Sequence, residues 1–146
     1  MADNKKRLFD AMARETAEFE KMATILNKKL EAVSNLNSAA VLNIVGEEFA
    51  ELKKIQTVEK ERAEILKELA LSGADLNDLR VLEKKLGKED SEVYGKLHRS
   101  LKHEFTRVQS LNGISRAVLK HSLAFIRQNI SILTDGGNRK LVDRRA

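Results

Sequence analysis

The histidines are the side chains of this sequence best suited to metal binding or acid–base catalysis, and their spacing argues against both. Besides His121 there are His98 and His103, which are five residues apart. That separation places the two rings on different faces of a helix, whereas a helical metal pair needs a spacing of three or four residues. Both also lie in a stretch rich in Lys and Arg. We therefore expect solvated histidines and no metal site.

The remaining residue types are not arranged for catalysis either. The sequence has no Cys, which excludes disulfides, thiolate metal sites and cysteine nucleophiles. It has no Gly-rich phosphate-binding loop. Its carboxylates mostly stand three or four residues from Lys or Arg, as Glu64 does from Lys67, which is typical of a solvated helix face. We predict that the protein is not an enzyme and uses no cofactor, metal or small-molecule substrate.

One segment is unusual for its apolar pattern. Residues 105–134 contain no Asp or Glu, and their only basic candidates besides His121 are Arg107, Arg116, Lys120 and Arg127. Beside the main apolar stripe, to which Val118, Phe125 and Ile132 belong, runs a second one with a helical spacing of 4,3,4,3. The second stripe consists of Leu119, Leu123, Ile126, Ile130 and Leu133. Together the two stripes give a surface wider than one helical neighbour needs.

Two interpretations of this surface remain open. It could pack against two helices of its own chain, or part of it could receive an amphipathic helix from a partner. A helix lying on a membrane surface would also be basic and amphipathic, but such a helix usually carries Trp or Lys-rich flanks. The sequence has no Trp, and Lys is sparse in this segment, so membrane binding is disfavoured.

The composition indicates the elements that must position these residues. The chain has 146 residues, no Pro, 4% aromatic residues, 34% charged residues and 42% apolar residues. This predicts a single, all-helical domain. The first residues lack the apolar run of a signal peptide, and no uncharged stretch is long enough to span a membrane. We therefore expect a soluble cytoplasmic protein without membrane insertion.

Heptad spacing predicts two long helices first. One helix is expected from about residue 4 to residue 34, after Asp3 as N-cap. Its stripe is Phe9, Met12, Thr16, Phe19, Ala23, Leu26, Leu30 and Val33. After a polar break at residues 35–37, a second helix is expected from Asn37 or Ser38 to about Leu71. Its predicted stripe is Leu42, Val45, Phe49, Leu52, Gln56, Glu59, Ala63, Leu66 and Ala70, with Ile55, Val58, Ile65 and Leu69 just beside it.

A short helix and a very long one follow. Ser72 and Gly73 should end the second helix, and Asp75 should cap a short helix over residues 76–86, which Gly87 ends. The last helix should run from about residue 90 to residue 134. Its stripe keeps phase across Asn112-Gly113, so the helix is expected to be continuous, either straight or kinked there. The predicted fold is an elongated antiparallel hairpin plus a short helix and a long C-terminal helix, with one domain over residues 1–137 and a flexible basic tail over residues 138–146.

The charge distribution leaves alternatives open. Residues 1–73 carry 12 Lys and Arg against 13 Asp and Glu, whereas residues 74–146 carry 15 against 9. A basic half favours acidic partners, and nucleic acid is one of them, but no stacking aromatics or recognised motif accompany it. A structural coiled-coil or oligomerisation protein without a client is the other alternative. The oligomeric state stays open.

The C-terminal part resembles the end of the FlgN family of flagellar export chaperones. That family has an Asn followed by a pattern close to LLxxSLxFIxxxLxxL, and the run from residue 108 to residue 137 is similar to it. The matching residues are Asn112, Val118, Leu119, Ser122, Leu123, Phe125, Ile126 and Leu133. The run Val58–Arg62 is similar to the family's ExxR-type run in the second helix. Gly113 and the basic tail depart from the pattern.

This resemblance implies an all-helical cytoplasmic chaperone of type III secretion, active in bacterial flagellum biogenesis. Its clients would be the hook-associated proteins of the hook–filament junction, gripped by their helical C-terminal ends until delivery for export. The export ATPase or the export gate would be a further partner. The resemblance and the apolar pattern together give the predicted client-binding residues, supported by Asn112. These are Val118, Leu119, Ser122, Leu123, Phe125, Ile126, Ile130 and Leu133.

Overall fold

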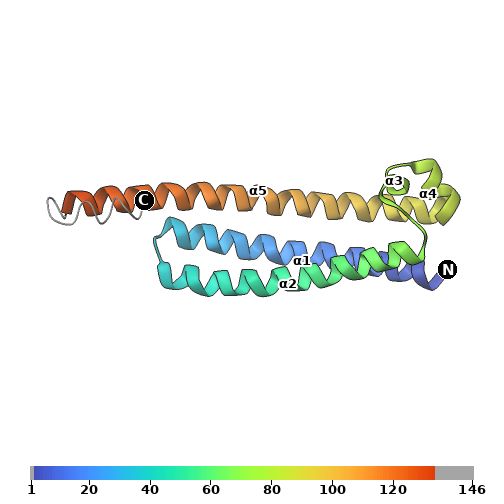
Figure 1. The fold of residues 1–146 in the computed structure, drawn as a ribbon, viewed down its shortest axis with the longest axis horizontal. Helices are drawn as coiled ribbons and strands as arrows, with labels where there is room; N and C mark the ends of the chain where they lie inside the picture. The colour runs from blue at the N-terminus through green and yellow to red at the C-terminus, as the bar shows by residue number, and fades with distance from the viewer. Residues whose placement is uncertain (1, 134–146) are drawn as a thin grey trace.

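The computed structural model describes residues 2–133, with side chains up to residue 114, and contains five helices (Figure 1). They are α1 (Ala2–Ser34), α2 (Ser38–Glu68), α3 (Gly73–Leu76), α4 (Leu79–Leu86) and α5 (Lys88–Leu133). No strand occurs within these residues, so the predicted all-α class is confirmed. The predicted boundary at residue 137 and the tail over residues 138–146 lie outside the described residues.

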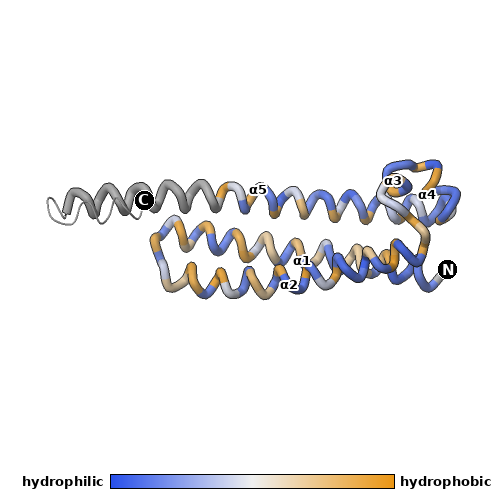
Figure 2. Tube along the Cα trace, viewed as in Figure 1, coloured by the Kyte–Doolittle hydropathy of each residue, from blue (hydrophilic) through white to orange (hydrophobic). Residues whose placement is uncertain are grey.

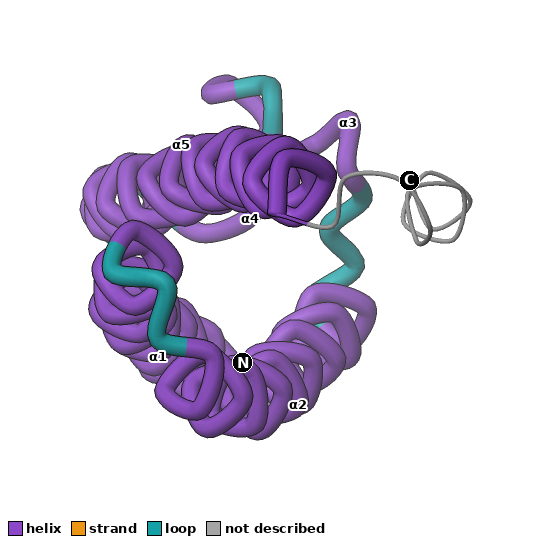
Figure 3. Tube along the Cα trace, turned by 90° about the vertical axis from the view of Figure 1, so that its left-hand side faces the viewer, coloured by secondary structure: helices purple, strands orange, loops and turns teal. Residues whose placement is uncertain are grey.

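Helix α1 is the central element of the rod. Helices α1 and α2 form the predicted antiparallel hairpin, and α5 lies along α1 in the same direction as α1 (Figure 1). Helix α1 packs closely against both α2 and α5. Between the described parts of α2 and α5 there is no comparable packing. Seen along the rod, the three long helices form an arc with α1 in the middle (Figure 3).

The turn between α1 and α2 shows why the hairpin closes there. Leu36 takes the left-handed conformation, with φ of 54°. Its N–H donates to the carbonyl of Val33, and the N–H of Asn37 donates to the carbonyl of Ala32. These two bonds satisfy the last carbonyls of α1. The side chain of Asn37 then accepts from the N–H of Ala40 and caps α2, as the polar break predicts.

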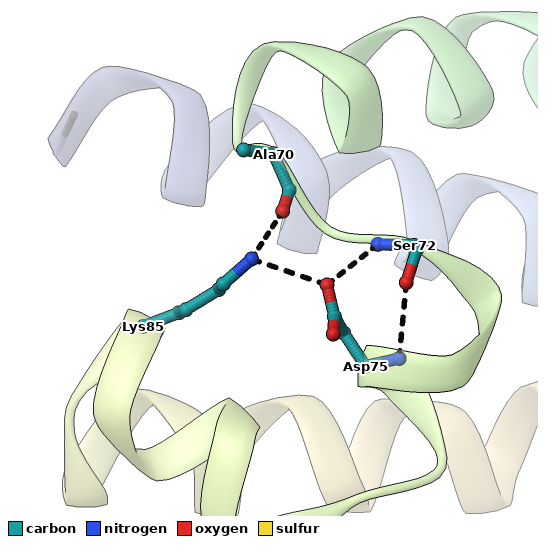
Figure 4. A network of polar contacts seen from close by, with 4 residues as sticks. All are labelled: Ala70, Ser72, Asp75 and Lys85. Atoms are coloured by element: carbon teal, nitrogen blue, oxygen red, sulfur yellow. Dashed lines mark hydrogen bonds and ion pairs between the residues drawn. The ribbon is translucent and has the colours of Figure 1, made fainter.

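The end of α2 differs from its predicted position. Helix α2 ends at Glu68, and Ala70, with φ of 56°, takes the left-handed conformation that the sequence assigns to the Ser72-Gly73 pair. Gly73 is instead the first residue of α3. Ser72 and Asp75 form a reciprocal cap there (Figure 4), because each side chain accepts a hydrogen bond from the other's backbone N–H.

The short predicted helix over residues 76–86 is two helices. Asp75 belongs to the cap of α3, and it is the side chain of Asp78 that caps α4 by accepting from the N–H of Arg80. Gly87 ends α4 as predicted, with φ of 94°. Helix α5 begins at Lys88, slightly earlier than predicted, and runs without interruption through Asn112-Gly113 to Leu133. The continuous last helix is therefore confirmed.

The core has two parts. The closed-end cluster surrounds the start of α1, the end of α2, helix α4 and the start of α5. It contains Leu8, Ala11, Met12, Ile65, Leu69, Leu71, Leu82, Leu86 and Tyr94. The open-end cluster lies further along the rod, between α1, the middle of α2 and the middle of α5. It contains Phe19, Met22, Leu26, Ile55 and Leu101.

Two lysines stabilise the closed end, which is the end of the rod that contains α3 and α4. The ammonium of Lys5 in α1 donates to the carbonyl of Leu86 at 2.8 Å and lies 3.4 Å from a carboxylate oxygen of Asp90. The ammonium of Lys85 in α4 donates to the carbonyl of Ala70 and to Asp75 (Figure 4). These contacts join the α3–α4 segment to both ends of the helical hairpin and to α5.

The predicted stripe of α2 is wrong along its whole length, because none of its nine residues is buried. Leu42, Val45, Phe49 and Leu52 are exposed, whereas the residues just beside the stripe are buried. Those buried residues are Ile55, Val58, Ile65 and Leu69. The physical reason is that α2 meets a single helix, α1, so only one narrow face of α2 is covered. Figure 2 shows the apolar residues that continue along α2 towards its turn with α1.

Candidate functional site

The apolar residues that α2 leaves exposed line an open groove. We call it the α2–α5 groove. It has a volume of ≈ 410 Å³, its floor is α1, and its walls are α2 and α5. It is lined by Phe19, Met22 and Leu26 of α1, by Val45, Glu48, Phe49, Leu52, Ile55, Gln56 and Glu59 of α2, and by Phe105, Val108, Gln109 and Asn112 of α5.

Large apolar side chains of the groove are in contact with solvent. Phe49 is 61% exposed and Leu52 is 43% exposed on the α2 wall, and Phe105 is 43% exposed on the α5 wall. Phe105 packs edge-on against Phe19 of the floor, with ring centroids 5.6 Å apart. The ammonium of Lys53 lies 5.0 Å from the ring centroid of Phe49 and partly covers it. A contiguous apolar surface of this kind is typical of a site for another protein segment.

The groove continues into a second, more polar cavity towards the closed end. This cavity has a volume of ≈ 330 Å³ and shares Phe19, Glu59 and Phe105 with the groove. At its base Nε of Arg62 lies 2.8 Å from a carboxylate oxygen of Glu15. Glu15 is only 1% exposed. Burial raises the pKa of its carboxyl, while Arg62 opposes that rise and Glu59 adds to it.

A pair of carboxyl groups lies between α1 and α2 beside the open-end cluster. Glu51 is 4% exposed, and burial together with the neighbouring Glu18 raises the pKa of its carboxyl to about 7. The pKa of Glu18 is lowered, first by its hydrogen bond with Glu51. One buried oxygen of each carboxyl has no hydrogen-bond partner among the described groups. A proton on Glu51, shared with Glu18, satisfies both oxygens.

The predicted client-binding residues fall mostly outside the side chains that the structure describes. Asn112 is half-buried and lines the end of the groove. The others lie on the part of α5 whose helical backbone is described but whose side chains are not. They are Val118, Leu119, Ser122, Leu123, Phe125, Ile126, Ile130 and Leu133. In Figure 1 this part of α5 continues past the turn that joins α1 to α2.

Sequence reasoning missed the α2 side of the site. It placed Val45, Phe49 and Leu52 in the core, because their spacing matches a heptad stripe. The available signal was the second apolar row at Ile55, Val58 and Ile65, which showed that α2 has two apolar faces. One of these faces packs on α1, and the other is exposed in the described structure. His98 and His103 are both exposed, as the Lys- and Arg-rich stretch around them predicts, and the ring of His98 stacks on Tyr94.

No group of three or more His, Cys, Asp or Glu side chains in the described part of the chain is placed to hold a metal ion. Among the same residues, no helix is both long and apolar enough to cross a membrane.

The comparison with protein families gives one match. The model of the family described as FlgN protein matches residues 1–142, which is almost the whole chain. Neither the search of curated proteins nor the search of solved structures found a match. The matched range covers all five helices and therefore both the groove and the end of α5. The chain belongs to the FlgN family, whose members are chaperones of flagellar type III export.

Proposed function

We propose that this protein is a cytoplasmic chaperone that binds the helical C-terminal end of hook-associated proteins of the flagellar hook–filament junction. It prevents their premature assembly and delivers them to the type III export apparatus, where the export ATPase or the export gate receives the complex. The observation that carries the proposal is membership of the family in a chain whose open end exposes a continuous apolar surface.

The proposed client-binding segment is the end of α5. Its sequence has two apolar stripes and no acidic residue, and its backbone is helical to Leu133. The residues assigned to the client are Val118, Leu119, Ser122, Leu123, Phe125, Ile126, Ile130 and Leu133. A helix with one wide apolar face can hold the apolar face of a second amphipathic helix.

The proposed mechanism is burial of the surface through which the client assembles. An amphipathic terminal helix whose apolar face lies against α5 is not available to another copy of the client. Each Leu- or Ile-sized side chain that becomes fully buried contributes roughly 1.5–3 kcal/mol before the costs of association. Three or four such side chains suffice for a dissociation constant on the order of micromolar, which permits release at the export apparatus.

The test is a charge placed within the proposed client face. Ile126→Asp puts a carboxylate among apolar contacts, and an unpaired buried charge is strongly unfavourable. We expect it to weaken binding of a purified hook-associated protein by at least about 100-fold in titration calorimetry. Gln128→Asp is the matched control, because the same charge then lies almost opposite on the helix, and its binding should stay close to that of the parent chain.

Circular dichroism distinguishes the two open interpretations of that face. If it belongs to a client site, Ile126→Asp keeps the helical signal and loses only binding. Loss of helicity would place Ile126 in the internal core of the chain and contradict the assigned site. A parent chain that binds no hook-associated protein, but forms a stable oligomer in light scattering, would favour the structural coiled-coil alternative instead.

A further inference from the structure

We propose that the α2–α5 groove is a second binding site for the same client helix. Phe49, Leu52 and Phe105 are then client-binding residues in addition to those at the end of α5. This inference rests on the proposed function, because the occupant is the helical segment of the client. It adds a binding surface on α2, from which neither the sequence pattern nor the family resemblance predicts any contact.

The shape of the groove fits one helix. Helices α2 and α5 both pack on α1 and are not packed on each other in the described residues. The groove lies between them over α1, where a four-helix bundle would hold its fourth helix. On α2 the lining residues run from Val45 to Glu59, which corresponds to about 21 Å of helix or about four turns. A partner helix of that length presents a row of apolar side chains at helical spacing.

The groove and the end of α5 share one register along a continuous helix. On a helix, a face recurs every three or four residues, and this spacing leads from Phe105 through Val108 or Gln109 to Asn112. The same spacing continues through residue 116 to the register positions 119, 123, 126 and 130 of the second apolar stripe. A helix bound along the end of α5 therefore reaches the groove without changing direction.

The carboxylate of Glu59, at the end of the groove next to the second cavity, indicates which charge the client helix carries. Glu59 lines both the groove and the neighbouring polar cavity, and it has no ion-pair partner among the described residues. Glu48, the other carboxylate of the groove, is already paired with Lys29 at 3.0 Å. A Lys or Arg beside the apolar row of the client helix would pair with Glu59. The partner is thus an amphipathic helix with a basic residue towards the closed end of the rod.

The first experiment compares two equally exposed apolar residues. Phe49 is 61% exposed in the groove, and Leu79 is 63% exposed at the start of α4 outside it. We expect Phe49→Ser to weaken binding of a purified hook-associated protein by roughly 10- to 100-fold, and Leu79→Ser to change it less than about twofold. Neither side chain is buried, so both variants should fold.

The outcomes separate this inference from the proposed function. If Ile126→Asp removes binding while Phe49→Ser and Leu79→Ser bind alike, the groove is not a client site and the proposed function still holds. If the parent chain does not bind the hook-associated protein, both proposals fail. Glu59→Lys should weaken binding, and this effect should shrink at high salt, because the contact is ionic and partly exposed.

The absence of cysteine allows a second, direct measurement. Gln56→Cys introduces a thiol into the groove, and Thr57→Cys introduces one at the exposed neighbouring position outside it. Saturating client should slow alkylation of the first thiol at least about tenfold and leave the second unchanged. Equal alkylation with and without client would overturn the inference. Slow alkylation of Cys at position 56 in the free chain would also overturn it. If that protection rises with protein concentration, a second copy of the chain occupies the groove. If it does not, the chain's own terminal segment occupies it.

Discussion

The closed end and the open end of this rod are built from the same helices, yet they bury their apolar residues to different degrees. At the closed end, α4 and the loops around it add a further wall, and Leu8, Met12 and Ile65 are fully buried. At the open end, the described residues provide only α1, α2 and α5, and Leu42, Phe49 and Leu52 are exposed. On α2 the row of Ile55, Val58, Ile65 and Leu69 is buried along the rod, whereas the other apolar row ends at Leu52 and continues as Gln56 and Glu59 towards the closed end.

This difference depends on which faces of the helices have a neighbour. The α2 row that faces α1 is core at both ends, and the second row is exposed at the open end, where the described residues do not cover it. The ion pair between Glu15 and Arg62 lies at the boundary, between the closed-end cluster and the open-end cluster. A chaperone of this design holds its fold at one end and offers its apolar surface at the other.

The largest expected difference between the two ends is in stability. Ile65→Ala removes a fully buried side chain from the closed end and should lower the free energy of unfolding by about 2–5 kcal/mol. Leu52→Ala, on the 43% exposed groove wall, should cost less than about 1 kcal/mol. Urea unfolding followed by circular dichroism measures both. Equal losses would contradict the division into a closed and an open end.

The boundary ion pair should have the next largest effect. Arg62→Met leaves the carboxyl of Glu15 buried without its guanidinium partner. We expect the free energy of unfolding to fall by about 3 kcal/mol at pH 7. This is the low end of the range for buried pairs, because Arg62 is partly exposed. The loss should be smaller at pH 5, where Glu15 protonates more readily. The double variant Glu15→Met with Arg62→Met is the control, and it should recover most of the lost stability. If the double variant is as unstable as Arg62→Met, the ion pair stabilises the fold by more than neutralising the buried charge of Glu15.

The carboxyl pair should make the open end sensitive to pH. The pKa of Glu51 is about 7 in the folded chain and close to the ordinary 4.5 when unfolded. Its contribution to stability is therefore fully present below about pH 4.5 and is lost as the pH rises through about 7. The lowered pKa of Glu18 acts in the opposite sense, and its contribution is lost only as the pH falls below about 4.5. Between pH 5 and pH 8 the parent chain should lose about 2–3 kcal/mol from this pair.

Glu51→Gln tests the origin of that pH dependence. A glutamine amide donates to Glu18 at every pH, so the variant should be more stable than the parent chain at pH 8 and similar to it at pH 5. Thermal unfolding at the two pH values measures the difference. Glu47→Gln, at an exposed position on α2, is the control and should leave the pH dependence in place. A parent-like pH dependence in Glu51→Gln would place its source elsewhere.

The smallest expected effect concerns the end of α2. Ala70 has φ of 56°, a conformation that glycine adopts without a steric penalty. Ala70→Gly should raise the free energy of unfolding by less than about 1 kcal/mol, because the greater freedom of glycine in the unfolded chain offsets part of the gain. A decrease of the melting temperature would contradict the left-handed conformation at this residue.

The helices were predictable because their signals are local. The polar break at residues 35–37, Gly87 and the unbroken phase across Asn112-Gly113 each report the backbone nearby, and each prediction is confirmed. The end of α2 was not predictable in the same way. Ala70 rather than a glycine takes the left-handed conformation there, and the backbone hydrogen bond from Leu71 to Leu66 stabilises it without a sequence signature.

The groove could not be predicted because it depends on how many helices cover a face. The stripe of α1 was only part of its core, since Leu8, Glu15 and Met22 are also buried. These residues are buried because α1 lies between two helices, which no periodicity within α1 reveals. For α2 the opposite holds, because one of its two apolar faces has no neighbour in the part of the chain that the structure describes. The client-binding residues assigned to the end of α5 stay a prediction.

Amide hydrogen exchange of the full chain, with and without a saturating purified hook-associated protein, tests the central claim most directly. The account predicts that the client slows exchange in residues 42–56 of α2 and in residues 105–133 of α5, while residues 72–94 at the closed end exchange as in the free chain. Slower exchange confined to the closed end, or no change anywhere with the client bound, would contradict it.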